Sequence, residues 1–123
     1  MPLTVLVVDD SMLIRHTVCR VLEGRGFAVE SATNGVEALE MLSSLQPDLI
    51  VTDLLMPKMD GYEFMAELKK NPQTATIPVV VLAGRQSSEQ KCDDRARWVI
   101  YKDIDIVTQL QRAVETILPA VPQ

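Results

Sequence analysis

Short runs of hydrophobic residues alternate along this chain with longer stretches in which hydrophobic residues recur every three or four positions. The short runs are rich in β-branched residues and are bounded by turn-forming residues, which predicts buried strands. Four such runs cover residues 3–8, 48–53, 77–83 and 98–101. A fifth run, 27–31, alternates hydrophobic and polar residues, which is typical of a strand at the edge of a sheet.

The longer stretches between these runs predict amphipathic helices. In the first helix, which Asp10 or Ser11 can cap, the expected hydrophobic stripe consists of Leu13, Ile14, Thr17, Val18, Val21 and Leu22. Asp60 and Glu63 have the spacing of a capping box, so we expect another helix from Asp60 to about residue 70. The stretch 84–97 is mostly polar, and a helix there would be short and exposed.

Strands that alternate with helices five times along 123 residues predict an α/β fold, (βα)5, in one domain, 1–123. The expected architecture is a doubly wound, five-stranded parallel sheet with helices on both faces.

Composition narrows the possible functions. The formal net charge of −5 argues against direct binding to nucleic acid, which needs basic patches. No hydrophobic run has transmembrane length and the N-terminus has no signal-peptide pattern, so we expect a cytoplasmic protein without membrane contact. The cysteines, Cys19 and Cys92, lie far apart in the sequence and are expected to be free thiols.

Charged residues stand where several predicted strands end. Asp9 and Asp10 follow the first strand, Asp53 ends the third, and Lys102 follows the fifth. In doubly wound sheets, ligands bind at the carboxyl ends of the strands, near the point where the strand order reverses. We therefore expect three carboxylates and one ammonium group to meet at this edge.

Such a cluster of carboxylate oxygens suits Mg²⁺, which takes one or two carboxylates together with waters and phosphate oxygens. An aspartate can also act as a nucleophile and form an acyl phosphate. In that reaction Lys102 would pair with the phosphoryl group as a mobile point charge. The alternative for Lys102 is a structural role, in which it only neutralises the acids.

At this point the sequence resembles a known family. Val7-Val8-Asp9-Asp10-Ser11, Asp53 followed by Met56-Pro57 and Asp60-Gly61, and the strand-end Lys102 are similar to the receiver domain of bacterial response regulators. The resemblance implies a CheY-like, flavodoxin-like sheet with the strand order 2-1-3-4-5. It also implies that a sensor histidine kinase or a phosphotransfer protein phosphorylates Asp53, and that the domain then signals through contacts with a downstream protein.

The resemblance further implies a set of site residues. Asp10, Asp53 and the backbone carbonyl of Leu55 would hold Mg²⁺, and Asp9 would act mainly through water. Asp53 and Lys102 would carry the chemistry. The resemblance also implies that the chain is not an ordinary enzyme but a phosphoacceptor that assists its own phosphorylation and dephosphorylation.

Three positions depart from the family pattern. Ala83 stands where the family usually has Thr or Ser, Asp103 follows Lys102 where Pro is usual, and Val99 occupies an aromatic position. These departures raise an alternative function, an atypical receiver that is a phosphorylation-insensitive scaffold for protein contacts. A metal-dependent phosphatase and a nucleotide binder fit less well, because the sequence lacks a second acid two residues after Asp53 and a glycine-rich phosphate loop.

Overall fold

The computed structural model describes residues 3–83, 97–102 and 105–117. Within this part of the chain, five parallel strands form one sheet in the order β2-β1-β3-β4-β5, which confirms the predicted topology. The strands are β1 (Thr4–Val8), β2 (Ala28–Ala32), β3 (Leu49–Asp53), β4 (Val79–Ala83) and β5 (Trp98–Tyr101). The alternating run is indeed an edge strand, β2.

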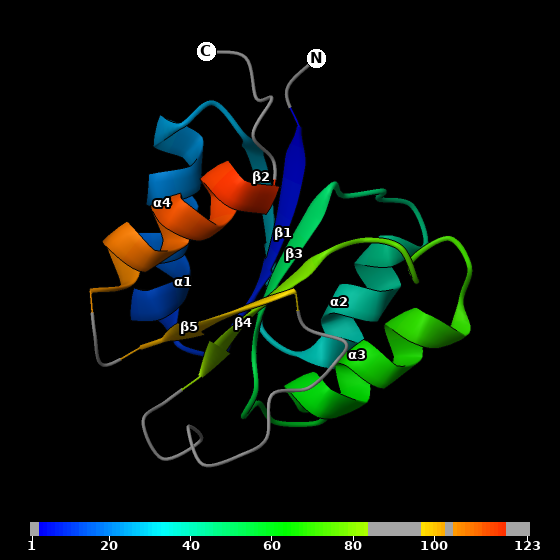
Figure 1. Cartoon of the computed structure of the whole chain (residues 1–123). Helices are drawn as coiled ribbons and strands as arrows, with labels where there is room; N and C mark the ends of the chain where they lie inside the picture. The colour runs from blue at the N-terminus through cyan, green and yellow to red at the C-terminus, as the bar shows by residue number, and fades with distance from the viewer. Residues whose placement is uncertain (1–2, 84–96, 103–104, 118–123) are drawn as a thin grey trace.

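Helices cover both faces of the sheet, as Figure 1 shows: α1 and α4 lie on one face, and α2 and α3 on the other. Their bounds are α1 (Met12–Gly24), α2 (Gly35–Leu42), α3 (Gly61–Lys70) and α4 (Ile106–Ile117). Ser11, Asn34 and Asp60 each accept a hydrogen bond from a backbone N–H of the first turn, which begins α1, α2 and α3. The capping box of Asp60 and Glu63 is present.

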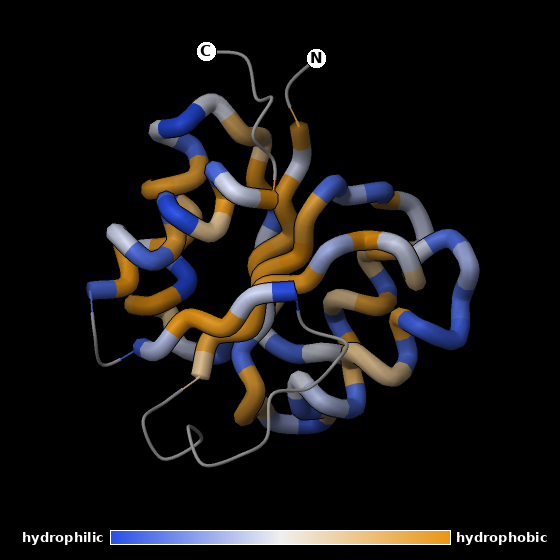
Figure 2. Tube along the Cα trace, viewed as in Figure 1, coloured by the Kyte–Doolittle hydropathy of each residue, from blue (hydrophilic) through white to orange (hydrophobic). Residues whose placement is uncertain are grey.

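The core has two parts because successive side chains of a strand point to opposite faces. In β1, Leu6 and Val8 pack on the side of α2 and α3, whereas Val5 and Val7 pack on the side of α1 and α4. Figure 2 shows the central strands as the most hydrophobic part of the chain. The sheet is therefore packed on both faces, between α2 and α3 on one side and α1 and α4 on the other.

The predicted stripe of α1 is wrong at one position. Leu13 is 73% exposed, whereas Val18 and Leu22 are fully buried. At 100° per residue, Leu13 points about 140° away from Val18, so it cannot face the same sheet. Ile14, which also belongs to the predicted stripe, precedes Val18 by one helical turn and packs against the core.

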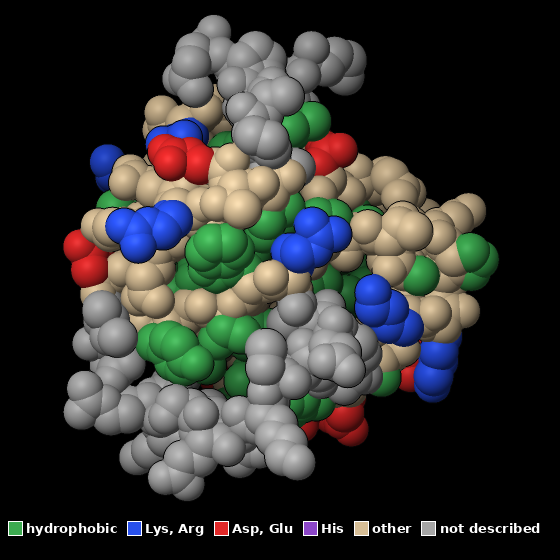
Figure 3. All heavy atoms as spheres, viewed as in Figure 1, with side chains coloured by type: hydrophobic (Ala, Val, Ile, Leu, Met, Phe, Trp, Pro, Cys, Tyr) green, Lys and Arg blue, Asp and Glu red, His purple; other side chains and the backbone are tan. Residues whose placement is uncertain are grey.

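Some predictions concern residues outside the described part of the chain: the exposed stretch at 84–96, the residue after Lys102, and Cys92. Cys19 is a free thiol, as expected. None of the described helices is both long and apolar enough to cross a membrane. On the face shown in Figure 3, Lys and Arg side chains are spread among hydrophobic ones, and acidic side chains lie towards the margins.

Candidate functional site

The strand register brings the predicted site residues together at the carboxyl edge of the sheet. Val8 of β1 pairs with Thr52 of β3, so Asp9 lies beside Asp53. On the other side of β3, Asp53 pairs with Leu82 of β4. The strand order reverses between β1 and β3, which is where a doubly wound sheet forms its binding site.

Three carboxylates meet at this point. One oxygen from each of Asp9, Asp10 and Asp53 lies within 4.8 Å of the other two. Asp9 is fully buried and Asp53 is 5% exposed, whereas Asp10 is exposed. The predicted cluster is therefore present, and it has two buried members and one that water reaches.

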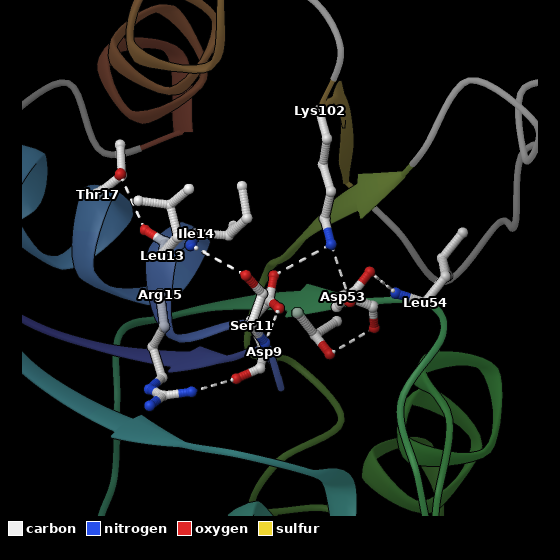
Figure 4. A network of polar contacts seen from close by, with 10 residues as sticks. Asp9, Ser11, Leu13, Ile14, Arg15, Thr17, Asp53, Leu54 and Lys102 are labelled. Atoms are coloured by element: carbon white, nitrogen blue, oxygen red, sulfur yellow. Dashed lines mark hydrogen bonds and ion pairs between the residues drawn. The ribbon is translucent and has the colours of Figure 1, made fainter.

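Lys102 reaches this cluster from the edge strand. Its Nζ lies 2.9 Å from Oδ2 of Asp53 and 3.3 Å from Oδ2 of Asp9, and Figure 4 shows the side chain extended towards both acids. The other oxygen of Asp53, Oδ1, accepts a 2.8 Å hydrogen bond from the backbone N–H of Leu54. Both oxygens of Asp53 are thus engaged, and its carboxylate has one defined orientation.

The buried carboxylate of Asp9 has weaker polar contacts than that of Asp53. Its Oδ1 accepts a 2.8 Å hydrogen bond from the backbone N–H of Ser11, but its buried Oδ2 has no hydrogen-bond partner among the described residues. Burial raises the pKa of Asp9 above its ordinary value and the charge on Asp53 adds to this, while the hydrogen bond from Ser11 and the ammonium group of Lys102 oppose it only in part. A buried carboxylate oxygen is stabilised by a cation or a water molecule, and the Lys102 ammonium group at 3.3 Å is the cation nearest to Oδ2 among the described residues.

Lys102 shows the opposite balance between burial and charge. Burial by itself would lower the pKa of Lys102, but the hydrogen bond to Asp53 and the negative charges of Asp9 and Asp53 raise it above its ordinary value. Lys102 is therefore charged at neutral pH. One ammonium group faces three carboxylates, so the cluster keeps an excess of negative charge.

This excess makes the cluster a suitable site for a hard divalent cation. All three donors are carboxylates, the donor type that Mg²⁺ prefers, and among the described residues the buried Oδ2 of Asp9 has an ion pair with Lys102 at 3.3 Å but no hydrogen bond. Asp10 is exposed, so a cation could keep some of its waters there. The residues present thus fit Mg²⁺. The backbone carbonyl of Leu55 accepts no hydrogen bond from the described residues, so its part in the site stays a prediction.

The loop after β3 packs closely against the backbone of Asp53 and Leu54. The N–H of Gly61 donates a 2.8 Å hydrogen bond to the carbonyl oxygen of Leu54. A Cβ atom at Gly61 would collide with the carbonyl oxygen of Asp53. The loop also contains Lys58 at φ 70°, and Met59 donates across it to the carbonyl of Pro57 at 2.7 Å, as in a γ-turn.

Comparison with known proteins decides the family. The family described as "Response regulator receiver domain" matches residues 5–115. The chain belongs to this family. Proteins named response regulator MprA are 37% identical in Mycobacterium sp. (strain KMS) and 40% identical in Mycobacterium ulcerans (strain Agy99), each over 91 residues. The match covers 74% of this receiver domain but only 39% and 38% of those proteins, so the chain spans about two fifths of their length.

Solved structures agree with this assignment. The receiver domain resembles the chemotaxis response regulator CheY4 of Vibrio cholerae, with a TM-score of 0.85, 29% identity, and coverage of 96% of this chain and 100% of that one. It also resembles the signal receiver domain of a signal transduction histidine kinase from Syntrophus aciditrophicus. That match has a TM-score of 0.80 and 34% identity, and it covers 98% of this chain and 92% of that one. The predicted CheY-like, flavodoxin-like fold is confirmed.

Sequence reasoning missed two residues that support the site of this receiver domain. Arg15 donates a 2.8 Å hydrogen bond from its guanidinium to the backbone carbonyl of Asp9, one helical turn beyond the N-cap Ser11. Gln109 pairs with the backbone of Tyr101, next to Lys102. For Arg15, its position one turn into the helix after Asp9 was an available signal. For Gln109, no local pattern indicates the partner.

Proposed function

We propose that this receiver domain accepts a phosphoryl group on Asp53 from the phosphohistidine of a sensor histidine kinase or a phosphotransfer protein. The observation that supports this best is the fixed orientation of the Asp53 carboxylate between the Leu54 N–H and the Lys102 ammonium group. Asp53 is the acid at the end of the central strand β3, with Asp9 on one side and Lys102 on the other. It is therefore the best-placed nucleophile of the three.

In the proposed reaction, a carboxylate oxygen of Asp53 attacks the phosphorus atom. The new O–P bond forms as the P–N bond of the phosphohistidine breaks, and the imidazole nitrogen leaves with the electron pair of that bond. The product is an acyl phosphate on Asp53 and an unphosphorylated histidine. Water then attacks the phosphorus atom of the acyl phosphate, the O–P bond to Asp53 breaks, and inorganic phosphate leaves as the carboxylate is restored. The domain thus assists both steps without being an ordinary enzyme.

Two anions have to meet in this reaction, so positive charge at the cluster determines whether it proceeds. Asp10, Asp53 and the backbone carbonyl of Leu55 would hold Mg²⁺, and Asp9 would bind its waters. Bound there, the ion would neutralise charge on the carboxylate and phosphoryl oxygens. The ammonium group of Lys102 lies 2.9 Å from the carboxylate of Asp53. After phosphorylation it would form an ion pair with a phosphoryl oxygen instead.

Intact mass spectrometry tests this proposal. Incubation with acetyl phosphate and Mg²⁺ should add one phosphoryl group to the chain, and Asp53→Asn should abolish the addition. Asp60→Asn is the matched control, because Asn caps a helix as well as Asp does, so this variant should be phosphorylated like the wild type. Phosphorylation that persists in Asp53→Asn would refute the assignment of the acceptor.

A second candidate function is supported by Ala83. Its methyl group is buried at the end of β4, and its backbone carbonyl accepts a 2.8 Å hydrogen bond from the N–H of Lys102. No hydroxyl group stands at this position to follow a phosphoryl group on Asp53. The alternative is therefore a receiver domain that binds its downstream protein in the same way whether or not Asp53 is phosphorylated.

The remaining parts of the proposal concern context. We propose that residues 1–123 act as a single receiver domain in the cytoplasm and signal by contacts with another protein, without direct binding to nucleic acid. The net charge of −5 supports the last point, because phosphate backbones attract basic surfaces. A binding assay that compares the affinities of the phosphorylated and the unphosphorylated domain for the downstream protein would distinguish the two functions. Different affinities indicate a receiver that phosphorylation regulates, and equal affinities indicate a phosphorylation-insensitive scaffold.

A further inference from the structure

We propose that Gln109 of α4 is a positioning residue for Lys102. Its side-chain amide binds both polar groups of the Tyr101 backbone and so holds the end of β5 where the Lys102 side chain begins. Gln109 makes no described contact with the acids, so its effect on them acts through Lys102. The consequence for phosphorylation rests on the function proposed above.

Two hydrogen bonds join the side chain of Gln109 to the backbone of Tyr101. The N–H of Tyr101 donates to Oε1 of Gln109 at 3.1 Å, and Nε2 of Gln109 donates to the carbonyl of Tyr101 at 2.9 Å. A carboxamide has the same donor and acceptor as a peptide group, so Gln109 pairs with Tyr101 as a neighbouring strand would. β5 is the edge strand of the sheet, and this pairing occupies its free side at that residue.

The hydrogen-bonded pair of Gln109 and Tyr101 lies at the end of β5. Tyr101 is the last residue of β5 and pairs with Ala83, the last residue of β4. Beyond this point, one described backbone hydrogen bond links the two strands, from the N–H of Lys102 to the carbonyl of Ala83. Strand ends fray when few hydrogen bonds hold them. Gln109 therefore secures the side of β5 that β4 cannot reach.

Gln109 is itself well anchored. Its Nε2 also donates to the backbone carbonyl of Asp105 at 3.2 Å, which ties it to the start of its own helix. The helix is fixed to the sheet by the buried side chains Leu110, Ala113 and Val114. The side-chain amide of Gln109 thus fixes the end of β5 relative to α4, which is itself packed on the sheet.

Lys102 needs such support because its ammonium group must meet two acids from two other strands. Nζ lies 2.9 Å from Asp53 and 3.3 Å from Asp9, at the end of a flexible four-carbon stem. The stem can only hold this geometry if the backbone from which it extends is fixed. Groups at a reacting centre need placement to within about 0.5 Å, and a displacement of about 1 Å can cost up to a hundredfold in rate.

The test uses Gln109→Met, which keeps the length and helix propensity of the side chain and removes its two hydrogen bonds to Tyr101 together with the one to Asp105. The matched control is Gln111→Met in the same helix, because Gln111 makes no side-chain hydrogen bond to another described residue. In the metal-free protein, amide hydrogen exchange at Tyr101 and Lys102 should be about tenfold faster in Gln109→Met than in the control. Exchange rates equal to the control at both residues would overturn the proposal.

The second measurement links Gln109 to Lys102 by a double-mutant cycle. With acetyl phosphate and Mg²⁺, Gln109→Met should slow phosphorylation about tenfold, and it should cause no further loss in a Lys102→Met background. The same loss in both backgrounds would show that Gln109 does not act through Lys102 and would overturn the proposal. If wild-type protein takes no phosphoryl group, the proposed function fails, and the exchange measurement still decides whether Gln109 holds the strand end.

Discussion

The N–H of Gly61 donates a 2.8 Å hydrogen bond to the carbonyl oxygen of Leu54, which places the start of α3 directly against the end of β3. This close approach leaves no room for a side chain, because a Cβ atom at Gly61 would meet the carbonyl oxygen of Asp53. The glycine that begins α3 therefore supports the residue that we propose as the phosphoacceptor.

Gly61→Ala should consequently destabilise the domain by about 1–3 kcal/mol, the usual cost of overpacking a tight site. Gly24→Ala is the matched control: a Cβ at Gly24, in the last turn of α1, meets nothing within 4 Å. Alanine there should stabilise the fold by about 0.5–1 kcal/mol, because it restricts the unfolded chain and favours the helix. Urea unfolding followed by circular dichroism measures both changes, and equal effects of the two substitutions would contradict this account.

Asp10→Asn should stabilise the metal-free protein and remove its response to Mg²⁺. The carboxylates of the cluster lie within 4.8 Å of one another, and Asp10 is the exposed member. In water, two such charges repel by about 1 kcal/mol, so the gain should be of that order. In the wild type, Mg²⁺ should raise the melting temperature by mass action. Thermal melts with and without Mg²⁺ check both points, and a metal-free variant that melts below the wild type would refute the repulsion.

Asp105 should make the stability of α4 depend on pH in the acid range. Its exposed carboxylate accepts hydrogen bonds from the hydroxyl of Thr108 at 2.8 Å and from the Thr108 N–H at 3.1 Å, and these lower the pKa of Asp105 below its usual value. A lowered pKa means that the stabilisation is present above the unfolded-state pKa, about 4, and is lost as the pH falls through the folded-state pKa.

The comparison with Asp105→Asn isolates this effect. Asn can accept the same hydrogen bonds but carries no charge, so the wild type should melt higher than the variant at pH 6 and lose that advantage towards pH 3. Melting curves of both proteins over this range give the difference directly. A difference that stays constant with pH would show that the charge of Asp105 does not matter.

Ala83→Thr tests whether the missing hydroxyl limits the response to phosphorylation. A hydrogen bond to a charged group contributes about 1.5–3 kcal/mol, and the buried methyl of Ala83 cannot make one. With Mg²⁺ and beryllofluoride, a phosphoryl mimic, amide shifts of the wild type should change mainly around the acid cluster. In Ala83→Thr they should spread along β4 and β5. Ala83→Val, which has the shape of Thr without its hydroxyl, should behave like the wild type. A wide response in the wild type would refute this prediction.

Much of this domain could be predicted from local sequence. Strand runs such as 48–53 and the capping box of Asp60 and Glu63 depend on residues close together in the chain, so their periodicity and spacing are sufficient. The convergence of Asp9, Asp53 and Lys102 was also predictable. In a parallel doubly wound sheet, every carboxyl end reaches the same edge, whatever the side chains between them.

The tertiary structure alone decided how these residues differ in environment. Asp9 and Asp10 are neighbours in sequence, yet the first is fully buried and the second is exposed. The direction in which each side chain leaves the strand end depends on the packing of α1 and the sheet.

The pairing of Gln109 with Tyr101 is the clearest case of a contact that only the fold could decide. Eight positions separate the two residues, and their meeting depends on how α4 packs back against the edge of β5. A glutamine in a helix has no sequence pattern that names its partner. Sequence by itself determined which residues stand at the strand ends, because those positions follow from local periodicity. Which groups are buried, paired or held there was decided by long-range packing.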